Sequence, residues 1–438
     1  MPAVALHADA FARLAESVAR VNGVPNARRA YVPTPVLDQP ADVIQGYIEG
    51  DDPVAGRPLM DVVLESLTRP VSADDLRGVE FDRSTPRLLE PDTEENLHRR
   101  FRENRWTDFL PIVLPTEERV EAMLAGTSHA RDEIVGRLRP TTYRELWEFD
   151  VEKVAVNAVM AGAEPQHLPV ILALASSGFT ARQSSTSSMG AVVVVNGPIR
   201  FELDMNRGLG ALGPYNHANA VIGRAYGLLS QNLQGGSVPG VTYMGCQGNT
   251  YAYNSVTFAE NEENSPWEPY HVSNGHAPGD STVSVFFCWG NSWSEGLRDT
   301  WREKLQATFA GQDPFMGSLL LLDPIVAQEL VDLGFATKAD LIAWIHDNVK
   351  IPAREYWDSY TAKTFAREEA DLGVEPYATY AKAGPDDLIP VFEPERLNIV
   401  VVGGSSNGQW GSFNGRPLDP RFRNDPNDPH VVSIDRWR

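Results

Sequence analysis

The sequence predicts an α/β protein with a mixed, partly parallel sheet core flanked by helices and an irregular, proline-rich N-terminal extension. Short apolar segments that suit buried strands alternate with segments whose apolar residues recur at helical spacing. The strand candidates are almost continuously apolar, as expected for strands covered on both faces. With 438 residues, of which 42% are hydrophobic, the chain can bury a large core. We expect an N-terminal helix and extended arm over 1–104, an α/β core with the candidate active site over 105–290, and a C-terminal α/β portion over 291–438.

The N-terminal part begins with a helix pattern and continues as connecting sequence. Apolar residues recur at helical spacing over 5–22, and Asn22 followed by Gly23 is typical of a helix end. The stretch from 24 to 100 is rich in proline and acidic residues, with a helical segment near 58–67. Because proline-rich connecting sequence rarely builds its own core, we expect an arm that wraps a neighbouring subunit, which favours a homo-oligomer.

The middle part carries the clearest strand and helix signals. Residues 109–114 are a short apolar segment, and Thr116 with the acidic residues after it resembles a helix start, so a strand followed by a helix is expected. Residues 191–195 are the clearest buried strand, and the turn residues Asn196, Gly197 and Pro198 end it. Further elements expected here are helices over 152–160, 166–176 and 219–233 and a strand over 282–287.

The C-terminal part continues the alternation. Strands are expected over 319–322 and 397–402, with helices over 330–333 and 338–349 between them. A glycine- and serine-rich run at 403–407 closes the last strand. We find no repeat at a fixed period.

Charge and composition exclude several classes of partner. The chain carries 59 acidic residues against 38 Lys plus Arg, a formal charge of −21, which argues against nucleic acid or an anionic membrane as the main partner. A small-molecule substrate fits better. No apolar run approaches the roughly 20 residues of a membrane span, and the N-terminus lacks signal-peptide features, so we expect a cytoplasmic protein. Only Cys246 and Cys288 are present, which excludes a disulfide framework.

An acid-free segment, residues 206–259, contains no aspartate or glutamate. It is rich in glycine and asparagine, and its only charged side chains are Arg207 and Arg224. It ends abruptly at a group of carboxylates, Glu260, Glu262 and Glu263. Neutral hydrogen-bonding groups that meet a carboxylate cluster are typical of a binding or catalytic site.

Residues 208–213 match the pattern G-x-G-x-x-G. The residues before them are not an apolar strand, Pro214 follows directly, and no acidic residue lies about twenty positions on, so we do not expect a dinucleotide cofactor. Two interpretations stay open: a glycine-rich loop that binds an anionic group with help from Arg200, Arg207 or Arg224, or glycines that permit close packing.

Candidate roles follow from side-chain chemistry. His217, at a predicted helix start, is the histidine that we select as a proton carrier, with a capping role as the alternative. One of Glu260, Glu262 and Glu263 could act as an acid with a raised pKa while another stays ionised; a solvated turn is the alternative. Substrate-binding roles are assigned to Asn157, Asn196, Arg200, Asn216, Asn219 and Arg224.

No cofactor is predicted, although a divalent metal is left open. Glutamates and histidines such as His271 and His276 follow the acid-free segment, but their spacing matches neither H-E-x-x-H nor an EF-hand. Cys246 lies among glycine and polar residues and is the alternative nucleophile. The hydroxyl-rich residues 184–188 lack the G-x-S-x-G elbow and indicate a hydrogen-bonding loop.

Five segments together resemble the bacterial UGSC-type (seleno)protein-related family: 106–111, 115–120, 152–162, 195–199 and 219–225. The family name refers to a selenocysteine or cysteine motif, so the resemblance implies a shared pocket and hints at redox chemistry. This chain has Ala163 where that family's cysteine is expected, Phe109 where glycine is usual, and no U-G-S-C or C-x-x-C motif.

Three functional hypotheses follow. The first is an enzyme that acts on a small, anionic organic substrate by acid–base chemistry of the lyase or hydrolase type, without a redox cofactor. The second is a thiol-dependent oxidoreductase that uses Cys246 with a partner protein. The third is a non-catalytic binding or scaffold subunit, for which Ala163 in place of cysteine would mark lost chemistry.

Overall fold

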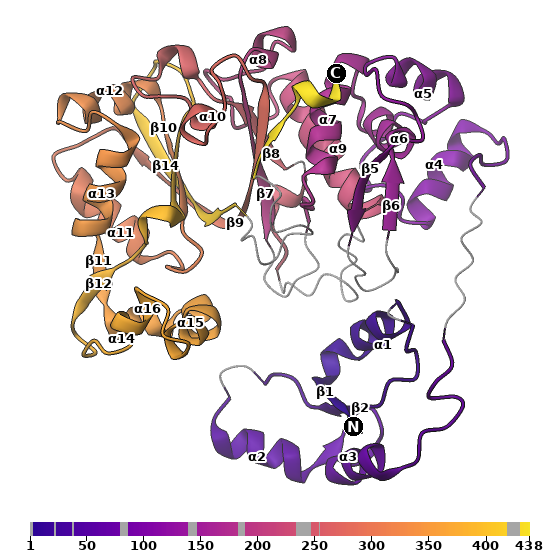
Figure 1. Cartoon of the computed structure of the whole chain (residues 1–438). Helices are drawn as coiled ribbons and strands as arrows, with labels where there is room; N and C mark the ends of the chain where they lie inside the picture. The colour runs from indigo at the N-terminus through magenta and orange to yellow at the C-terminus, as the bar shows by residue number, and fades with distance from the viewer. Residues whose placement is uncertain are drawn as a thin grey trace.

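The computed structural model describes residues 3–21, 23–36, 39–78, 86–138, 147–182, 189–233, 247–253, 255–417 and 430–438. A seven-stranded mixed sheet with helices packed against it forms the main body, and a smaller unit is built from the N-terminal residues (Figure 1). The predicted α/β fold class is therefore confirmed.

The N-terminal unit has a small core of its own. Strand β1 (Ala5–Ala8) pairs in parallel with β2 (Arg29–Val32), and α1 (Ala12–Val21) connects them. Helix α3 (Leu59–Thr68) buries Leu59 and Val62 against Ala30 and Val32 of β2. The expectation that this region builds no core is wrong, because alternate apolar residues of β2 meet one face of α3. The unit also contains α2 (Ala41–Glu49), β3 (Asp51–Asp52) and β4 (Arg57–Pro58).

The main sheet has the strand order β13-β10-β14-β9-β7-β8, and β15 pairs with β9. Strands β7 and β8 are parallel, β10 and β13 are parallel, and the other neighbours are antiparallel. The strands are β7 (Gly190–Asn196), β8 (Val256–Ala259), β9 (Thr282–Glu295), β10 (Ser318–Leu322), β13 (Leu397–Val401), β14 (Gln409–Arg416) and β15 (Val431–Ser433).

The long strand β9 divides the sheet into two wings (Figure 1). Its first half pairs with β7 and its second half with β14, where the register shifts between Asn414 and Gly415. A Cβ at Gly415 would lie 2.0 Å from the carbonyl oxygen of Phe287, so only glycine permits this close approach. The resulting shape is a V, with each wing ending in a pair of parallel strands.

Each face of the V has its own apolar core. The inner faces meet in one cluster that contains Val192 and Val194 of β7 with Leu319 and Leu321 of β10. Alternate residues of β7, including Val193, point outward into a cluster with α6, α7 and α9, and those of β10 into a cluster with the C-terminal helices. Burial on both faces explains the continuous apolar runs of these strands.

The two wings are built by the same succession of elements. β7, α9, β8 and β9 form a parallel βαβ unit whose last strand returns beside the first, and β10, α12, α13, β13 and β14 do the same. The sequences at the first strands also match: 189–199 is MGAVVVVNGPI and 316–325 is MGSLLLLDPI. Asp323 thus corresponds to Asn196. The structure reveals a duplicated unit that a search for a fixed period misses, because the connections differ in length.

Most predicted helices of the main body are confirmed, although α12 begins six residues before the predicted start at 330. In the N-terminal unit, the helix expected over 5–22 begins only at Ala12, because residues Ala5–Ala8 form β1. Thr116 accepts a hydrogen bond from the Arg119 backbone at the start of α5, and Asp150 accepts one from Lys153 at the start of α6. The confirmed helices are α5 (Glu117–Leu124), α6 (Val151–Ala161), α7 (Leu168–Ser176), α9 (His217–Asn232), α12 (Pro324–Asp332) and α13 (Lys338–Asn348).

One predicted strand is absent. Residues 109–114 form an irregular segment, in which Phe109 has a φ of 67°. The apolar run was a poor guide because Leu110 and Val113 are exposed and only Ile112 is buried.

The other main-body elements are α4 (Glu94–Glu103), β5 (Ile134–Leu138), β6 (Trp147–Asp150), α8 (Ile199–Glu202), α10 (Tyr270–Ser273), α11 (Trp301–Ala310), β11 (Lys350–Pro352), α14 (Ala353–Asp358), the π-helix η5 (Ala362–Ala366), α15 (Arg367–Asp371), α16 (Tyr377–Tyr380) and β12 (Leu388–Pro390).

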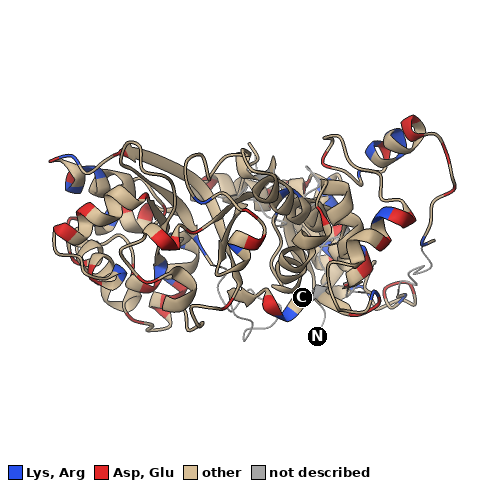
Figure 2. Ribbon diagram, turned by 90° about the horizontal axis from the view of Figure 1, so that it is seen from above, with Lys and Arg blue, Asp and Glu red and all other residues tan. Residues whose placement is uncertain are grey.

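Acidic and basic residues are interspersed along the outer helices in Figure 2. Within the described ranges, no helix combines the length and the apolar character needed to cross a membrane.

Candidate functional site

The carboxyl ends of both parallel strand pairs meet at the open end of the V. The segment after β8 reaches the other wing, since Asn261 donates its backbone N–H to the carbonyl of Val401 at 2.8 Å. The connection between α8 and α9 lies between the wings, where the carbonyl of Arg207 accepts the N–H of Gly403 at 2.9 Å. Ligands of open α/β sheets bind outside the carboxyl ends of the strands, so this is the expected position of a site.

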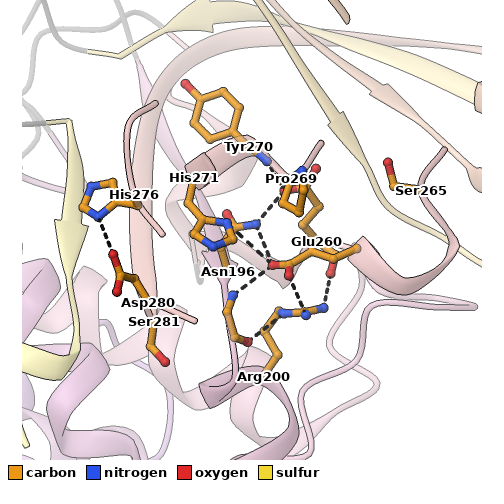
Figure 3. A network of polar contacts seen from close by, with 12 residues as sticks. Asn196, Arg200, Glu260, Ser265, Pro269, Tyr270, His271, His276, Asp280 and Ser281 are labelled. Carbon is orange, nitrogen blue, oxygen red and sulfur yellow. Dashed lines mark hydrogen bonds and ion pairs between the residues drawn. The ribbon is translucent and has the colours of Figure 1, made fainter. Parts of the chain in front are cut away.

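Asn196 and Glu260 form the centre of a polar network at this end (Figure 3). Asn196 is the last residue of β7, and Glu260 directly follows the adjacent parallel strand β8. Nδ2 of Asn196 lies 2.5 Å from Oε2 of Glu260 and 2.9 Å from Oε1 of Glu262. Glu260 is fully buried and also accepts hydrogen bonds from the Tyr270 backbone at 2.7 Å and from Nζ of Lys338 at 3.1 Å. With its oxygens enclosed, Glu260 holds the two wings together rather than moving protons.

Arg200 neutralises the next two carboxylates. Its side chain is 3% exposed, and the guanidinium lies 2.8 Å from Oε2 of Glu262 and 2.8 Å from Oε1 of Glu263. Oε1 of Glu262 also accepts the backbone N–H of Gly197 at 2.9 Å. These internal carboxylates occupy the donors of Arg200, which argues against its predicted role as a substrate anchor.

Glu263 is the most accessible of the three glutamates and has a second arginine partner. Nε of Arg207 donates to its Oε2 at 2.9 Å, and both side chains are about one-third exposed. Burial alone would raise the pKa of Glu263, but hydrogen bonds from Arg200 and Arg207 lower it below its ordinary value. An ionised carboxylate can accept a proton, so the expectation of a proton-donating acid does not fit Glu263.

His271 lies beside this network in Figure 3. Its ring is buried, Nδ1 is 3.9 Å from Oε1 of Glu262, and neither ring nitrogen has a hydrogen-bond partner among the described residues.

Next to the Arg207–Glu263 pair is a polar pocket of about 430 Å³. It lies where the acid-free segment meets the residues after β8. Its lining residues are Asp204, Met205, Asn206, Arg207, Gly208, Tyr215, Asn216, Asn261 and Asn264.

Asn216, which was assigned to substrate binding, and Arg207, which was named as a possible anion-binding residue, both line this pocket, while Asp204, Asn206, Asn261 and Asn264 were missed. All four lie close to the two ends of the acid-free segment, which is the signal that could have identified them. Asp204 is exposed and has a φ of 48°, a conformation uncommon for a non-glycine residue and concentrated at functional sites.

Asn219 shapes the pocket from beneath. Its Oδ1 accepts the backbone N–H of Asn206 at 3.1 Å, and its Nδ2 donates to the carbonyls of Asn206 at 2.9 Å and Ala211 at 3.3 Å. Asn219 is 3% exposed, so it positions the glycine-rich connection instead of contacting a ligand, which corrects its predicted role.

The G-x-G-x-x-G residues form turns between the wings and do not directly open a helix. Gly210 has a φ of 74°, and Leu209 packs so closely on Gly404 that a Cβ there would lie 2.6 Å from it. Within the motif, a Cβ at Gly213 would lie 2.5 Å from the ring of Tyr215, so close packing is observed at this glycine.

His217 lies away from the glutamates after β8. As the first residue of α9, it contacts His167, with ring centroids 5.5 Å apart, and its contacts include none of the three predicted glutamates. Glu164, His167 and His217 bring three possible metal ligands within 4.8 Å of one another, the only such group among the described residues.

The hydrogen bonding of His167 bears on metal binding there. Its Nδ1 accepts the backbone N–H of Glu164 at 3.0 Å, which places the proton of the neutral ring on Nε2 and leaves that nitrogen no lone pair. Burial, and to a lesser degree His217, lowers the pKa of His167 to about 4. The group thus fits a neutral buried histidine better than a metal ligand set.

Two predicted binding residues have structural partners elsewhere. Arg224 pairs with Asp108 at 3.0 Å and donates to the carbonyl of Pro111 at 2.7 Å, which anchors the irregular 109–114 segment. Asn157 accepts a hydrogen bond from Asn232 at the far end of α9. These contacts argue against their predicted roles in substrate binding.

Of the two cysteines, the structure describes only Cys288, which does not line the pocket. Cys246 and residues 184–188 lie outside the described residues. Cys288 is buried on β9, and burial raises the pKa of its thiol.

Comparisons with protein-family models, curated proteins and solved structures found no match. Membership of the UGSC-type family therefore stays a prediction.

Proposed function

We propose that this protein is an enzyme that binds a small organic anion at Arg207 and removes a proton from it, as lyases do in their first step. The observation that supports this is the Arg207–Glu263 ion pair at the edge of a polar pocket that is rich in asparagine side chains. An incoming carboxylate competes with Glu263 for Arg207, while Arg200 still holds Glu263 in place.

Glu263, which has lost its contact with Arg207 but is still held by Arg200, is the proposed base. Its lowered pKa keeps it ionised near neutral pH, and it loses one stabilising partner when the substrate occupies Arg207. The negative charge that develops on the substrate carboxylate stays beside the guanidinium of Arg207. Asn216 uses one side-chain N–H on the carbonyl of Asp204, and the second N–H is available to orient a ligand.

Deuterium exchange tests this proposal without knowledge of the complete reaction. Short hydroxy acids and dicarboxylic acids are incubated with the protein in D₂O, and proton NMR follows the C–H next to each carboxylate. Arg298→Met is the control, since Arg298 is an exposed arginine outside the pocket.

We expect the protein to accelerate exchange for at least one acid. Glu263→Gln should abolish exchange but retain binding, and Arg207→Met should weaken binding at least tenfold. Exchange that persists in Glu263→Gln rejects Glu263 as the base. Binding without exchange in the unmodified protein supports the non-catalytic hypothesis.

Assembly and location are further proposals. Exposed apolar side chains on α3, Met60 and Leu64, support self-association of the N-terminal unit, and the homo-oligomer is proposed on that basis. A cytoplasmic location is proposed because the chain has only two cysteines and therefore lacks a disulfide framework.

A further inference from the structure

A second pocket occupies the equivalent position in the other half of the duplicated fold. It has a volume of about 270 Å³ and lies at the carboxyl ends of β10 and β13. Asp323, the counterpart of Asn196, lines it.

The chemistry of this second pocket differs from that of the first. Its described lining contains no lysine or arginine, and Asp323 is its only ionisable residue. Apolar side chains, including Leu212, Leu321 and Val402, alternate with Ser406, Asn407 and Gln409. Such a lining disfavours an anion and suits an uncharged group that has both an apolar face and hydroxyls.

Trp293 supplies a flat aromatic surface. It pairs across the sheet with Gly411, where a Cβ would lie 2.1 Å from the indole, so one face of the ring rests on β14. The side chain is nevertheless 50% exposed. The buried face of the Trp293 indole is enough to cover Gly411. The exposed face is therefore free to stack on the apolar face of a hydroxylated ring.

The carboxylate of Asp323 can accept hydrogen bonds from ring hydroxyls. Its Oδ1 accepts the backbone N–H of Val326 at 2.9 Å and its Oδ2 accepts that of Gln409, which leaves each oxygen further acceptor capacity. Because these bonds fix the carboxylate, it is oriented before a ligand arrives.

The two pockets are adjacent. Gly208 lines both, and the Arg207–Gly403 backbone hydrogen bond joins their walls. We propose that the substrate is an organic acid that carries a hydroxylated ring, whose carboxylate pairs with Arg207 while the ring stacks on Trp293. This inference rests on the proposed anion site at Arg207.

Calorimetry with two matched acids tests the ring site. Quinate carries its carboxylate on a hydroxylated ring, and malate is a hydroxy acid without a ring. We expect quinate to bind about tenfold more tightly than malate, because one aromatic stacking contact contributes a difference in affinity of about this size. Trp293→Ala should remove this preference and leave malate binding unchanged, and Trp293→Phe should retain most of it.

Equal affinity for the two acids in the unmodified protein overturns the inference. A Trp293→Ala protein that loses malate binding to the same extent also overturns it, because Trp293 would then only support the fold. The uncharged methyl ester of quinate separates the two proposals. If no acid binds but the ester binds in a Trp293-dependent manner, the anion site fails and the ring site stands; if the ester does not bind either, both fail.

Discussion

Nε of Arg207 lies 2.9 Å from Oε2 of Glu263, which joins residues 56 positions apart in the sequence at the edge of one pocket. Arg207 belongs to the connection between α8 and α9, and Glu263 to the segment after β8. The pair therefore marks the place where the acid-free segment and the carboxylates meet in three dimensions. Its partial exposure distinguishes it from the buried Arg200 and Glu260 contacts nearby.

The two arginines of this network should affect stability differently. Arg200→Met removes a buried guanidinium and leaves Glu262 and Glu263 without their main partner, which should cost about 3–5 kcal/mol. Arg207→Met breaks only a partly exposed pair and should cost less than about 1 kcal/mol. Urea unfolding of both variants measures the difference, and equal losses would show that Arg207 is also structural.

The buried contact between Glu260 and Lys338 should respond asymmetrically to mutation. Lys338→Met leaves the fully buried carboxylate without its cation, with an expected loss of about 3–5 kcal/mol. Glu260→Gln keeps an acceptor for the Tyr270 backbone, so its loss should be smaller, about 1–3 kcal/mol. Denaturant unfolding tests the order of the two variants; the reverse order would argue against an ionised Glu260.

His167 should make the protein less stable in mild acid. Its folded-state pKa is lowered from 6.5 to about 4, so between these values the unfolded chain binds a proton that the folded protein does not. Stability from this source is complete above pH 6.5 and falls as the pH drops toward 4, by on the order of 3 kcal/mol. Unfolding measured at pH 7, 5.5 and 4.5 should show this loss.

The control for this experiment is His167→Gln, which removes the titrating ring but can retain an acceptor for the Glu164 backbone. Its stability should change less between pH 7 and pH 4.5 than that of the unmodified protein. An identical pH profile in both proteins would assign the acid sensitivity to other groups.

The two cysteines provide a test of the thiol hypothesis. Because Cys288 is buried and its pKa is raised, iodoacetamide should leave it unmodified in the native protein and alkylate it in urea. Peptide mass spectrometry identifies the modified thiol. If Cys246→Ser retains the exchange activity described above, the thiol-dependent oxidoreductase is rejected; if it abolishes that activity, the acid–base proposal loses its support.

Much of the fold could be predicted because its signals are local. The apolar run of 191–195 predicted β7, and Thr116 correctly marked the start of α5. The run at 109–114 failed because local apolarity does not reveal that Phe109 and Leu110 lie at the surface. Strand β14 (Gln409–Arg416), which contains glycine and polar residues, carries no such signal, although it forms half of the central pair.

The candidate site was less predictable because each role depends on distant partners. Asn219 and Arg224 were plausible ligands of a substrate in the sequence, but Asn206 and Asp108 occupy them in the structure. Asp204 was overlooked because its relation to Asn216 arises only when the α8–α9 connection folds back on the start of α9.

By itself, the sequence determined the most apolar strands and most of the helices of the main body, and that neutral hydrogen-bonding groups gather before a cluster of glutamates. Only the tertiary structure decided which of these groups face a pocket and which are consumed by internal partners. The reason is physical. Strand and helix formation follows from the spacing of apolar residues over a few positions. The contacts of Arg207 with Glu263 and of Asn261 with Val401 depend instead on the bend of β9, which brings the two wings of the sheet together.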